Sequence, residues 1–166
     1  MIVSPRRAVR VLSRHRQSGV GLIEVLVAVL LLSIAFLGIA ALQGRSLSTN
    51  NSAMARSLAT IASYSILDAM RADMDGARAG SYDRTGSSKI IANACPDASG
   101  TMAETQLGLW CAQLGQGLGA VETTTGQVAC ADTGATADCT ITITFDDSRA
   151  GVGGSRVQTI ATRAML

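Results

Sequence analysis

Residues 19–24 read Gly-Val-Gly-Leu-Ile-Glu, which places one carboxylate five residues after a glycine and at the start of a long apolar run. An ionised side chain inside a bilayer costs at least ~2.5 kcal/mol on insertion scales, so an acid at such a position usually marks function. The chemistry open to Glu24 is ion pairing with a positively charged group. Gly19 has the small size that peptidases require at a cut site beside an apolar segment.

The apolar run from Val25 to Leu42 contains eighteen residues without a charge. At ~1.5 Å per helical residue, this run is long enough to cross a hydrocarbon core. A secretory signal has a shorter apolar region with a small-residue cleavage site on its far side, whereas here the small residue comes first. Five arginines and no acid precede the run: Arg6, Arg7, Arg10, Arg14 and Arg16. The positive-inside rule therefore predicts a cytoplasmic N-terminus and export of everything after Leu42.

This N-terminal pattern resembles the class III signal of type IV prepilins and pseudopilins. In that signal a basic leader ends in Gly and is followed by an apolar residue, a variable one, Leu, Ile and Glu. The resemblance implies that residues 1–19 form a leader and that the prepilin peptidase cuts between Gly19 and Val20. The same enzyme would then methylate the new Val20 amine.

The resemblance also assigns assembly roles to Leu22, Ile23 and Glu24. In pilins the partner of this acid is thought to be the N-terminal amine of an adjacent subunit, which here is Val20. The pairing would help an incoming subunit to settle at a fixed register.

Four segments resemble the PilV family of minor pilins, whose members are also called type IV pilus modification proteins. These segments are 23–28, 37–43, 55–59 and 67–73. The membrane segment lacks the proline found in many major pilins, which argues against a bulk filament subunit. The resemblance implies a subunit that helps to initiate the pilus, at its tip, together with other minor pilins, the major pilin and the inner-membrane assembly machinery. It would cross the inner membrane once, with a periplasmic head that becomes extracellular in the pilus. Two alternatives stay open: a minor pseudopilin of a type II secretion system, and a membrane-tethered periplasmic binding module that never polymerises.

The length supports one membrane segment and one small domain. We expect one helix from Val20 to about Asp75, with a membrane and assembly half at 20–42 and a periplasmic half at 43–76, followed by a head at 77–166. Gly76 and Gly80 would stop the helix. Two apolar stripes lie beyond the membrane half: Leu47, Met54, Leu58 and Ile61 form one, and Ile66, Leu67, Met70 and Met74 form the other. We expect one stripe to pack on the head and the other to face neighbouring subunits, unless both are intramolecular core.

The head is predicted to combine one short helix with strands. Thr101 and Glu104 have the spacing of a capping box for a helix over 102–115, in which Trp110 is the expected core anchor. Residues 140–145 alternate strictly between Thr and an apolar residue, which predicts a strand with one buried face. Its expected neighbours are 120–131 and 156–164, separated from it by turns at 132–134 and 151–155. The fold class is therefore α+β and pilin-like, with a long N-terminal helix against a small antiparallel sheet of three or four strands.

All four cysteines follow the membrane segment; they are Cys95, Cys111, Cys130 and Cys139. An even number of cysteines in an oxidising compartment favours disulfides, and four cysteines allow three pairings. The local bridges Cys95–Cys111 and Cys130–Cys139 are preferred, because the second pair flanks a turn between two predicted strands. A zinc site is disfavoured because the chain has no Cys-x-x-Cys pair and no histidine after the leader.

Composition also argues against catalysis, a cofactor, a metal and nucleic-acid binding. The only histidine, His15, belongs to the leader, so a Ser-His-Asp or Cys-His arrangement is impossible after cleavage. The acidic pairs Asp146-Asp147 and Asp73/Asp75 lack metal-loop spacing and are expected to be solvated ends of elements. Removal of residues 1–19 takes away five of the fourteen basic residues, which leaves nine against twelve acids and changes the net charge from +2 to −3. The exported part therefore has no basic footprint for nucleic acid.

Overall fold

The computed structural model describes residues 19–148 and 155–166. The predicted leader, apart from Gly19, and most of the predicted turn at 151–155 lie outside the described residues. The chain divides into two compact units between Ala41 and Leu42, and each unit is described by itself.

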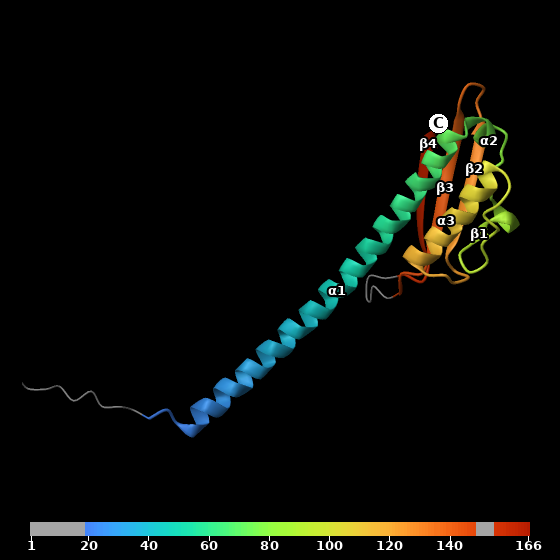
Figure 1. Cartoon of the computed structure of the whole chain (residues 1–166). Helices are drawn as coiled ribbons and strands as arrows, with labels where there is room; N and C mark the ends of the chain where they lie inside the picture. Colours follow the sequence, from blue (N-terminus) through green and yellow to red (C-terminus); the bar gives the residue numbers. More distant parts are fainter. Residues whose placement is uncertain (1–18, 149–154) are drawn as a thin grey trace, which may run out of the picture. The chain divides into compact units, whose positions relative to one another are not determined.

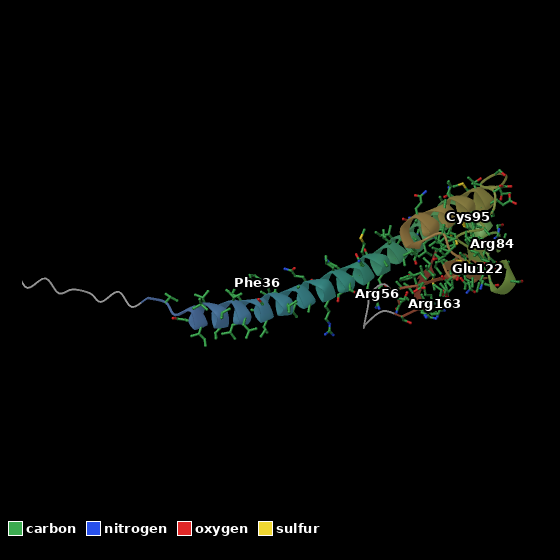
Figure 2. The ribbon with its side chains drawn as sticks, turned by 90° about the horizontal axis from the view of Figure 1, so that it is seen from below. Phe36, Arg56, Arg84, Cys95, Glu122 and Arg163 are labelled. Atoms are coloured by element: carbon green, nitrogen blue, oxygen red, sulfur yellow. A yellow bond between two sulfur atoms is a disulfide. The ribbon has the colours of Figure 1, made fainter. Side chains whose placement is uncertain are left out.

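The first unit consists of the beginning of helix α1, which spans Leu22–Ala72. Every described side chain from Gly19 to Ala41 is exposed, and apolar side chains such as Phe36 project from all sides of the helix (Figure 2). A helix that is apolar all round needs an apolar environment that this segment does not supply for itself.

Helix α1 ends at Ala72, a few residues before the predicted end at Asp75, because Asp73 caps a separate short helix. This helix, α2 (Met74–Arg78), includes Gly76, whose N–H donates to the Asp73 carboxylate at 3.2 Å. Gly76 therefore does not stop a helix, and the chain turns at Gly80, where φ is +73°. A positive φ of this kind favours glycine.

The head contains a four-stranded antiparallel sheet with the order β1-β2-β3-β4 (Figure 1). Its elements are the 3₁₀ turn η1 (Gly86–Ser88), β1 (Ile90–Ile91), α3 (Met102–Leu118), β2 (Thr125–Asp132), β3 (Ala137–Phe145) and β4 (Gln158–Met165). This arrangement confirms the α+β, pilin-like fold and the three strands that the sequence predicted. The two-residue strand β1 was not predicted.

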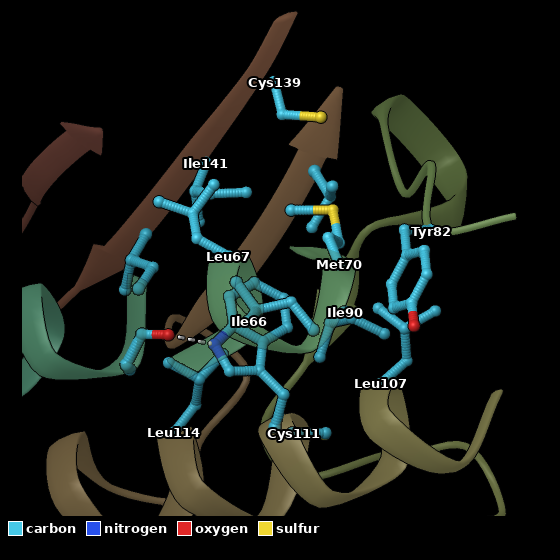
Figure 3. Packing of buried hydrophobic residues seen from close by; sticks show 14 of the residues in the cluster. Ile66, Leu67, Met70, Tyr82, Ile90, Leu107, Cys111, Leu114, Cys139 and Ile141 are labelled. Carbon is cyan, nitrogen blue, oxygen red and sulfur yellow. Dashed lines mark hydrogen bonds between the residues drawn. The ribbon is translucent and has the colours of Figure 1, made fainter. Parts of the chain in front are cut away.

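Strand β3 has the predicted alternation, since its apolar side chains are buried and its threonines are half-buried. Helices α1 and α3 lie against the same face of the sheet (Figure 1). Figure 3 shows Ile66, Leu67 and Met70 of α1 between Ile141 of β3 and Leu107 and Leu114 of α3. The core of the head is therefore a single layer of apolar side chains between two helices and one sheet.

Trp110 is the core anchor that the sequence predicted, with only 2% of its surface exposed. Its Nε1–H donates to the Ala62 carbonyl oxygen at 2.9 Å, which fixes α3 beside α1 (Figure 3). A Cβ atom at Gly126 of β2 would lie 2.4 Å from Cη2 of the Trp110 ring. The indole thus fits against the sheet only because residue 126 has no side chain.

The capping box at the start of α3 is also confirmed. The Glu104 N–H donates to the Thr101 hydroxyl oxygen at 3.2 Å, and the Glu104 carboxylate accepts the Thr101 N–H at 2.8 Å. The hydrogen bond from the Thr101 backbone lowers the pKa of Glu104, since it stabilises the ionised form.

The two predicted stripes of α1 differ in burial. Ile66, Leu67 and Met70 are buried in the core, whereas Met54 and Ile61 are 64% and 54% exposed. One face of the helix therefore packs on the head of the same chain, and the other is not covered by it.

The two acidic pairs are less solvated than the sequence suggested. Asp73 is half-buried and accepts a hydrogen bond from the hydroxyl of the buried Tyr82 at 3.2 Å. Burial, together with the charge and hydrogen bond of Asp73, raises the pKa of Tyr82 to about 12. Asp147 is only 5% exposed, so its expected position at a solvated strand end is wrong.

Asp147 is buried because it ties the end of β3 to α1. Its Oδ2 accepts a hydrogen bond from the hydroxyl of Ser52, which is itself buried, and its N–H donates to the Ser155 carbonyl oxygen at 2.9 Å. A buried carboxylate needs such partners, because its desolvation is otherwise uncompensated.

Replacement of Ser52 by alanine is expected to lower the free energy of unfolding by ~1–3 kcal/mol, because it removes one hydrogen-bond partner of a buried carboxylate. Urea denaturation of the purified chain measures the effect. Ser57→Ala changes an exposed serine of the same helix and serves as the control, with an expected change within ~0.5 kcal/mol. Equal unfolding midpoints for both variants would show that the Ser52–Asp147 bond contributes nothing.

Candidate processing and assembly site

The segment from Gly19 to Gly21 is exposed and has no regular secondary structure, and α1 begins immediately after it at Leu22. A Cβ atom at Gly19 would meet no atom within 4 Å. The bond between Gly19 and Val20 therefore lies in an accessible, irregular backbone, as a peptidase substrate requires. Within residues 19–148 and 155–166, the fold therefore does not require glycine at position 19.

Glu24 lies in the first turn of α1, where its N–H donates to the Gly21 carbonyl oxygen at 2.9 Å. An acid in the first turn is favoured by the helix dipole, which gives Glu24 a simple local role. Over residues 19–148 and 155–166, no ion pair includes its carboxylate. Leu22 and Ile23 precede it and are exposed. The three residues thus form one accessible group at the beginning of the helix.

The apolar segment that follows remains exposed within the chain. Among the described residues, α1 is the one helix long and apolar enough to cross a membrane. Its large aliphatic residues in this segment are all more than half exposed, apart from Val27 at 49%. The physical role of such a surface is contact with lipid or with other apolar helices.

The cysteines form two disulfides, Cys95–Cys111 and Cys130–Cys139. The first joins the loop before α3 to the helix, and the second joins residues that are directly opposite in β2 and β3. In the part of the chain that the structure describes, no cysteine is free and no group of three potential ligands is placed to hold a metal ion.

Comparison with protein families agrees with this geometry. Residues 14–40 match the prokaryotic N-terminal methylation motif. This match supports a type IV pilin-like protein. No curated protein and no solved structure matches the chain significantly.

The motif contains Gly19, Val20 and Glu24 and ends within the apolar part of α1. It is the substrate signal of the prepilin peptidase, and it associates a pilin-like chain with the pilus machinery. A pilin-type motif also indicates a structural protein rather than an enzyme. The single apolar helix is compatible with the single-pass membrane anchor of pilins.

Proposed function

We propose that the chain is a minor pilin of the PilV type, which helps to initiate type IV pilus assembly and enters the filament, near its tip, through its N-terminal helix. The segments 23–28, 37–43, 55–59 and 67–73 support the PilV assignment by their resemblance to that family. The methylation motif supports processing by the prepilin peptidase between Gly19 and Val20.

One observation carries the proposal. The first turn of α1 contains a single carboxylate that forms no ion pair within the described residues, and the helical segment that follows it, 25–41, is exposed and uncharged. Cleavage after Gly19 creates a positive amine at Val20, four residues before this carboxylate. Glu24 of one subunit then pairs with the Val20 amine of its neighbour. In an apolar surrounding this ion pair replaces the water that each charge has lost, and it fixes the register of the two helices.

The same proposal gives the topology and the partners. The N-terminus stays in the cytoplasm until cleavage because of five arginines, which are Arg6, Arg7, Arg10, Arg14 and Arg16. The head lies in the periplasm. The inner-membrane assembly machinery then extracts the processed chain together with other minor pilins and the major pilin. The head becomes extracellular at the end of the pilus.

Replacement of Glu24 by glutamine tests the proposal. The change keeps the size of the side chain and removes its charge, so the protein is expected to remain processed, stable and bound to the membrane. Pilus number per cell is expected to fall about tenfold or more, because removal of one partner of a buried ion pair costs ~3–5 kcal/mol. Pili are counted by electron microscopy at equal protein level. Glu122→Gln, which neutralises an exposed acid of the head, is the matched control and should leave pilus number unchanged.

The outcomes also separate the alternatives. Unchanged piliation in Glu24→Gln cells would remove this carboxylate from the assembly mechanism. A loss of protein secretion with normal pili would instead identify a type II secretion pseudopilin. If neither pili nor secretion depends on the chain, it is a membrane-tethered binding module that does not polymerise.

A further inference from the structure

Arg45 is the first charged residue that follows the apolar segment of α1. Residues 25–44 are uncharged, and these twenty residues match the length that a helix needs to cross a hydrocarbon core of ~30 Å. In a membrane-spanning α1, the Arg45 guanidinium therefore lies at the depth where the hydrocarbon ends and the lipid phosphates begin. No ion pair includes this guanidinium within residues 19–148 and 155–166.

Arg45 lines an open hollow of about 420 Å³ on the surface of α1. The other residues that line it are uncharged and belong to the turns before and after Arg45; they are Leu42, Ser46, Thr49 and Asn50. Neighbours in this set are three or four positions apart, so all of them share one face of the helix. Every side chain in the set is exposed. The hollow is therefore open to the surroundings of the helix.

The side chains of the hollow follow the order of the chemical groups along a phospholipid. Leu42, at the end that belongs to the apolar segment, is 70% exposed and suits contact with acyl chains. Arg45 comes next and presents a planar fork of N–H donors, which fits two oxygens of a phosphate. The Thr49 hydroxyl, one turn further on, donates to the Arg45 carbonyl oxygen at 3.0 Å, so its oxygen remains an acceptor for a headgroup hydroxyl.

The charge of the hollow selects among phospholipids. Arg45 is its one charged residue, and no acid lines it. Asp147, on the same side of α1 as Ser52, is buried and bound to that serine, seven positions beyond Arg45. A singly anionic lipid balances the charge of Arg45, whereas the ammonium group of phosphatidylethanolamine would find no anion in the hollow and would compete for the phosphate. The hollow therefore favours an anionic lipid whose headgroup has hydroxyls.

We propose that Arg45, Ser46, Thr49 and Asn50 form a binding site for the phosphate and glycerol headgroup of phosphatidylglycerol, in the leaflet from which α1 continues to the head. This inference goes beyond the proposed function, because it requires the membrane anchor and no assembly. The bound lipid fixes the depth of α1, since the guanidinium cannot enter the hydrocarbon core without losing the phosphate. Extraction of the chain from the membrane must break this contact.

Photo-cross-linking of the full chain, reconstituted in vesicles, tests the proposal. The vesicles contain phosphatidylglycerol and phosphatidylethanolamine in equal amounts. Benzoylphenylalanine replaces Leu42, at the apolar end of the hollow, and mass spectrometry identifies the lipids attached at residue 42. We expect about a fivefold excess of phosphatidylglycerol among these adducts. Lipids attracted by the arginines at 6–16 do not contribute, because only adducts at residue 42 are counted.

Matched variants test whether Arg45 holds the lipid. Arg45→Gln should return the adducts to the equal proportions of the vesicle, because the phosphate loses its counter-charge. Arg45→Lys keeps the charge without the fork and should retain part of the excess. Arg56→Gln makes the same change eleven residues further along α1, which is ~16 Å away and beyond a headgroup layer of ~5–8 Å. This control should keep the full excess, and equal thermal unfolding of the variants shows that the fold is intact.

A probe at Gly44 tests whether the selection belongs to one face of the helix. Gly44 is two positions from Leu42, so its side chain points to another side of α1, and a Cβ atom there would meet no atom within 4 Å. The adducts at residue 44 should therefore contain the two lipids in equal proportions.

Several results would overturn the inference. They are equal proportions of the two lipids at Leu42 in the chain with both arginines, the same excess at Gly44, and equal effects of Arg45→Gln and Arg56→Gln. Loss of the excess in the presence of inorganic phosphate would show a site for the free anion and not for a lipid. None of these measurements involves a second chain, so a negative result leaves the proposed function standing. The pilus count in Glu24→Gln cells decides that function without reference to lipid.

Discussion

Replacement of Gly19 by arginine is expected to leave the precursor uncut while its insertion into the membrane persists. The structure shows open space around residue 19, so a larger side chain does not disturb the fold of the chain. The effect would therefore arise in the peptidase, which requires a small residue at the cut site. Mass spectrometry of the membrane-bound protein measures it: the unmutated chain should begin at a methylated Val20, and Gly19→Arg should retain residues 1–19.

Gly19→Ala is the control for this processing experiment, since alanine is also small and should allow cleavage. The position of the cut in the unmutated protein is equally informative. Cleavage on the far side of the apolar run, after Leu42, would identify an ordinary secretory signal and contradict the prepilin assignment.

Replacement of Trp110 by alanine should have the largest effect on the stability of the head. Loss of a fully packed indole removes apolar contacts with both layers and leaves a cavity, which costs ~3–5 kcal/mol. A loss of this size is a large part of the stability of a small domain. The urea concentration at the midpoint of unfolding should therefore fall steeply. It is measured on the full chain in detergent, with the circular dichroism of the head as the signal.

Two matched variants divide this effect into its parts. Trp110→Phe keeps most of the apolar surface but removes the hydrogen bond to the Ala62 carbonyl, and it should cost ~1 kcal/mol for that bond in addition to a smaller packing loss. Leu109→Ala changes the exposed neighbour on α3 and should leave the midpoint nearly unchanged. A Trp110→Ala variant as stable as Leu109→Ala would contradict the packing described for the core.

The features of the fold that the sequence predicted are those with a local signal. The alternation in β3 predicts its buried face because successive side chains of a strand point to opposite sides. The capping box of α3 depends on two residues three positions apart, and both hydrogen bonds form within one turn. Helix α1 was predictable because it has no proline and a long apolar half.

The features that were missed depend on residues far apart in the sequence. Asp147 is buried because α1 brings Ser52 to it, and nothing near Asp147 in the sequence indicates this. Strand β1 has only two residues, and it is a strand because β2 pairs with it. The need for glycine at position 126 comes from the Trp110 ring on another element.

The methylation motif was predictable for a different reason. The signal of the prepilin peptidase is a linear motif, so the sequence contains the whole of it. The partner of Glu24 was predicted only by resemblance, because in the proposed assembly its positive group belongs to another molecule. The sequence or structure of one chain therefore shows the carboxylate but not the neighbouring molecule that would supply its positive partner.

The two disulfides have a consequence for how the head matures as its chain emerges from N-terminus to C-terminus. Each cysteine is joined to the next one along the chain, with separations of 16 and 9 residues, and neither loop encloses a cysteine of the other. Of the three pairings that four cysteines allow, this is the one that oxidation produces when each thiol reacts with the first available partner. Neither Cys130 nor Cys139 is needed for the Cys95–Cys111 bridge to close, because both follow it in the chain. We therefore expect maturation of the head to require an oxidant but no reshuffling by a disulfide isomerase, a slow step that non-consecutive bridges often impose.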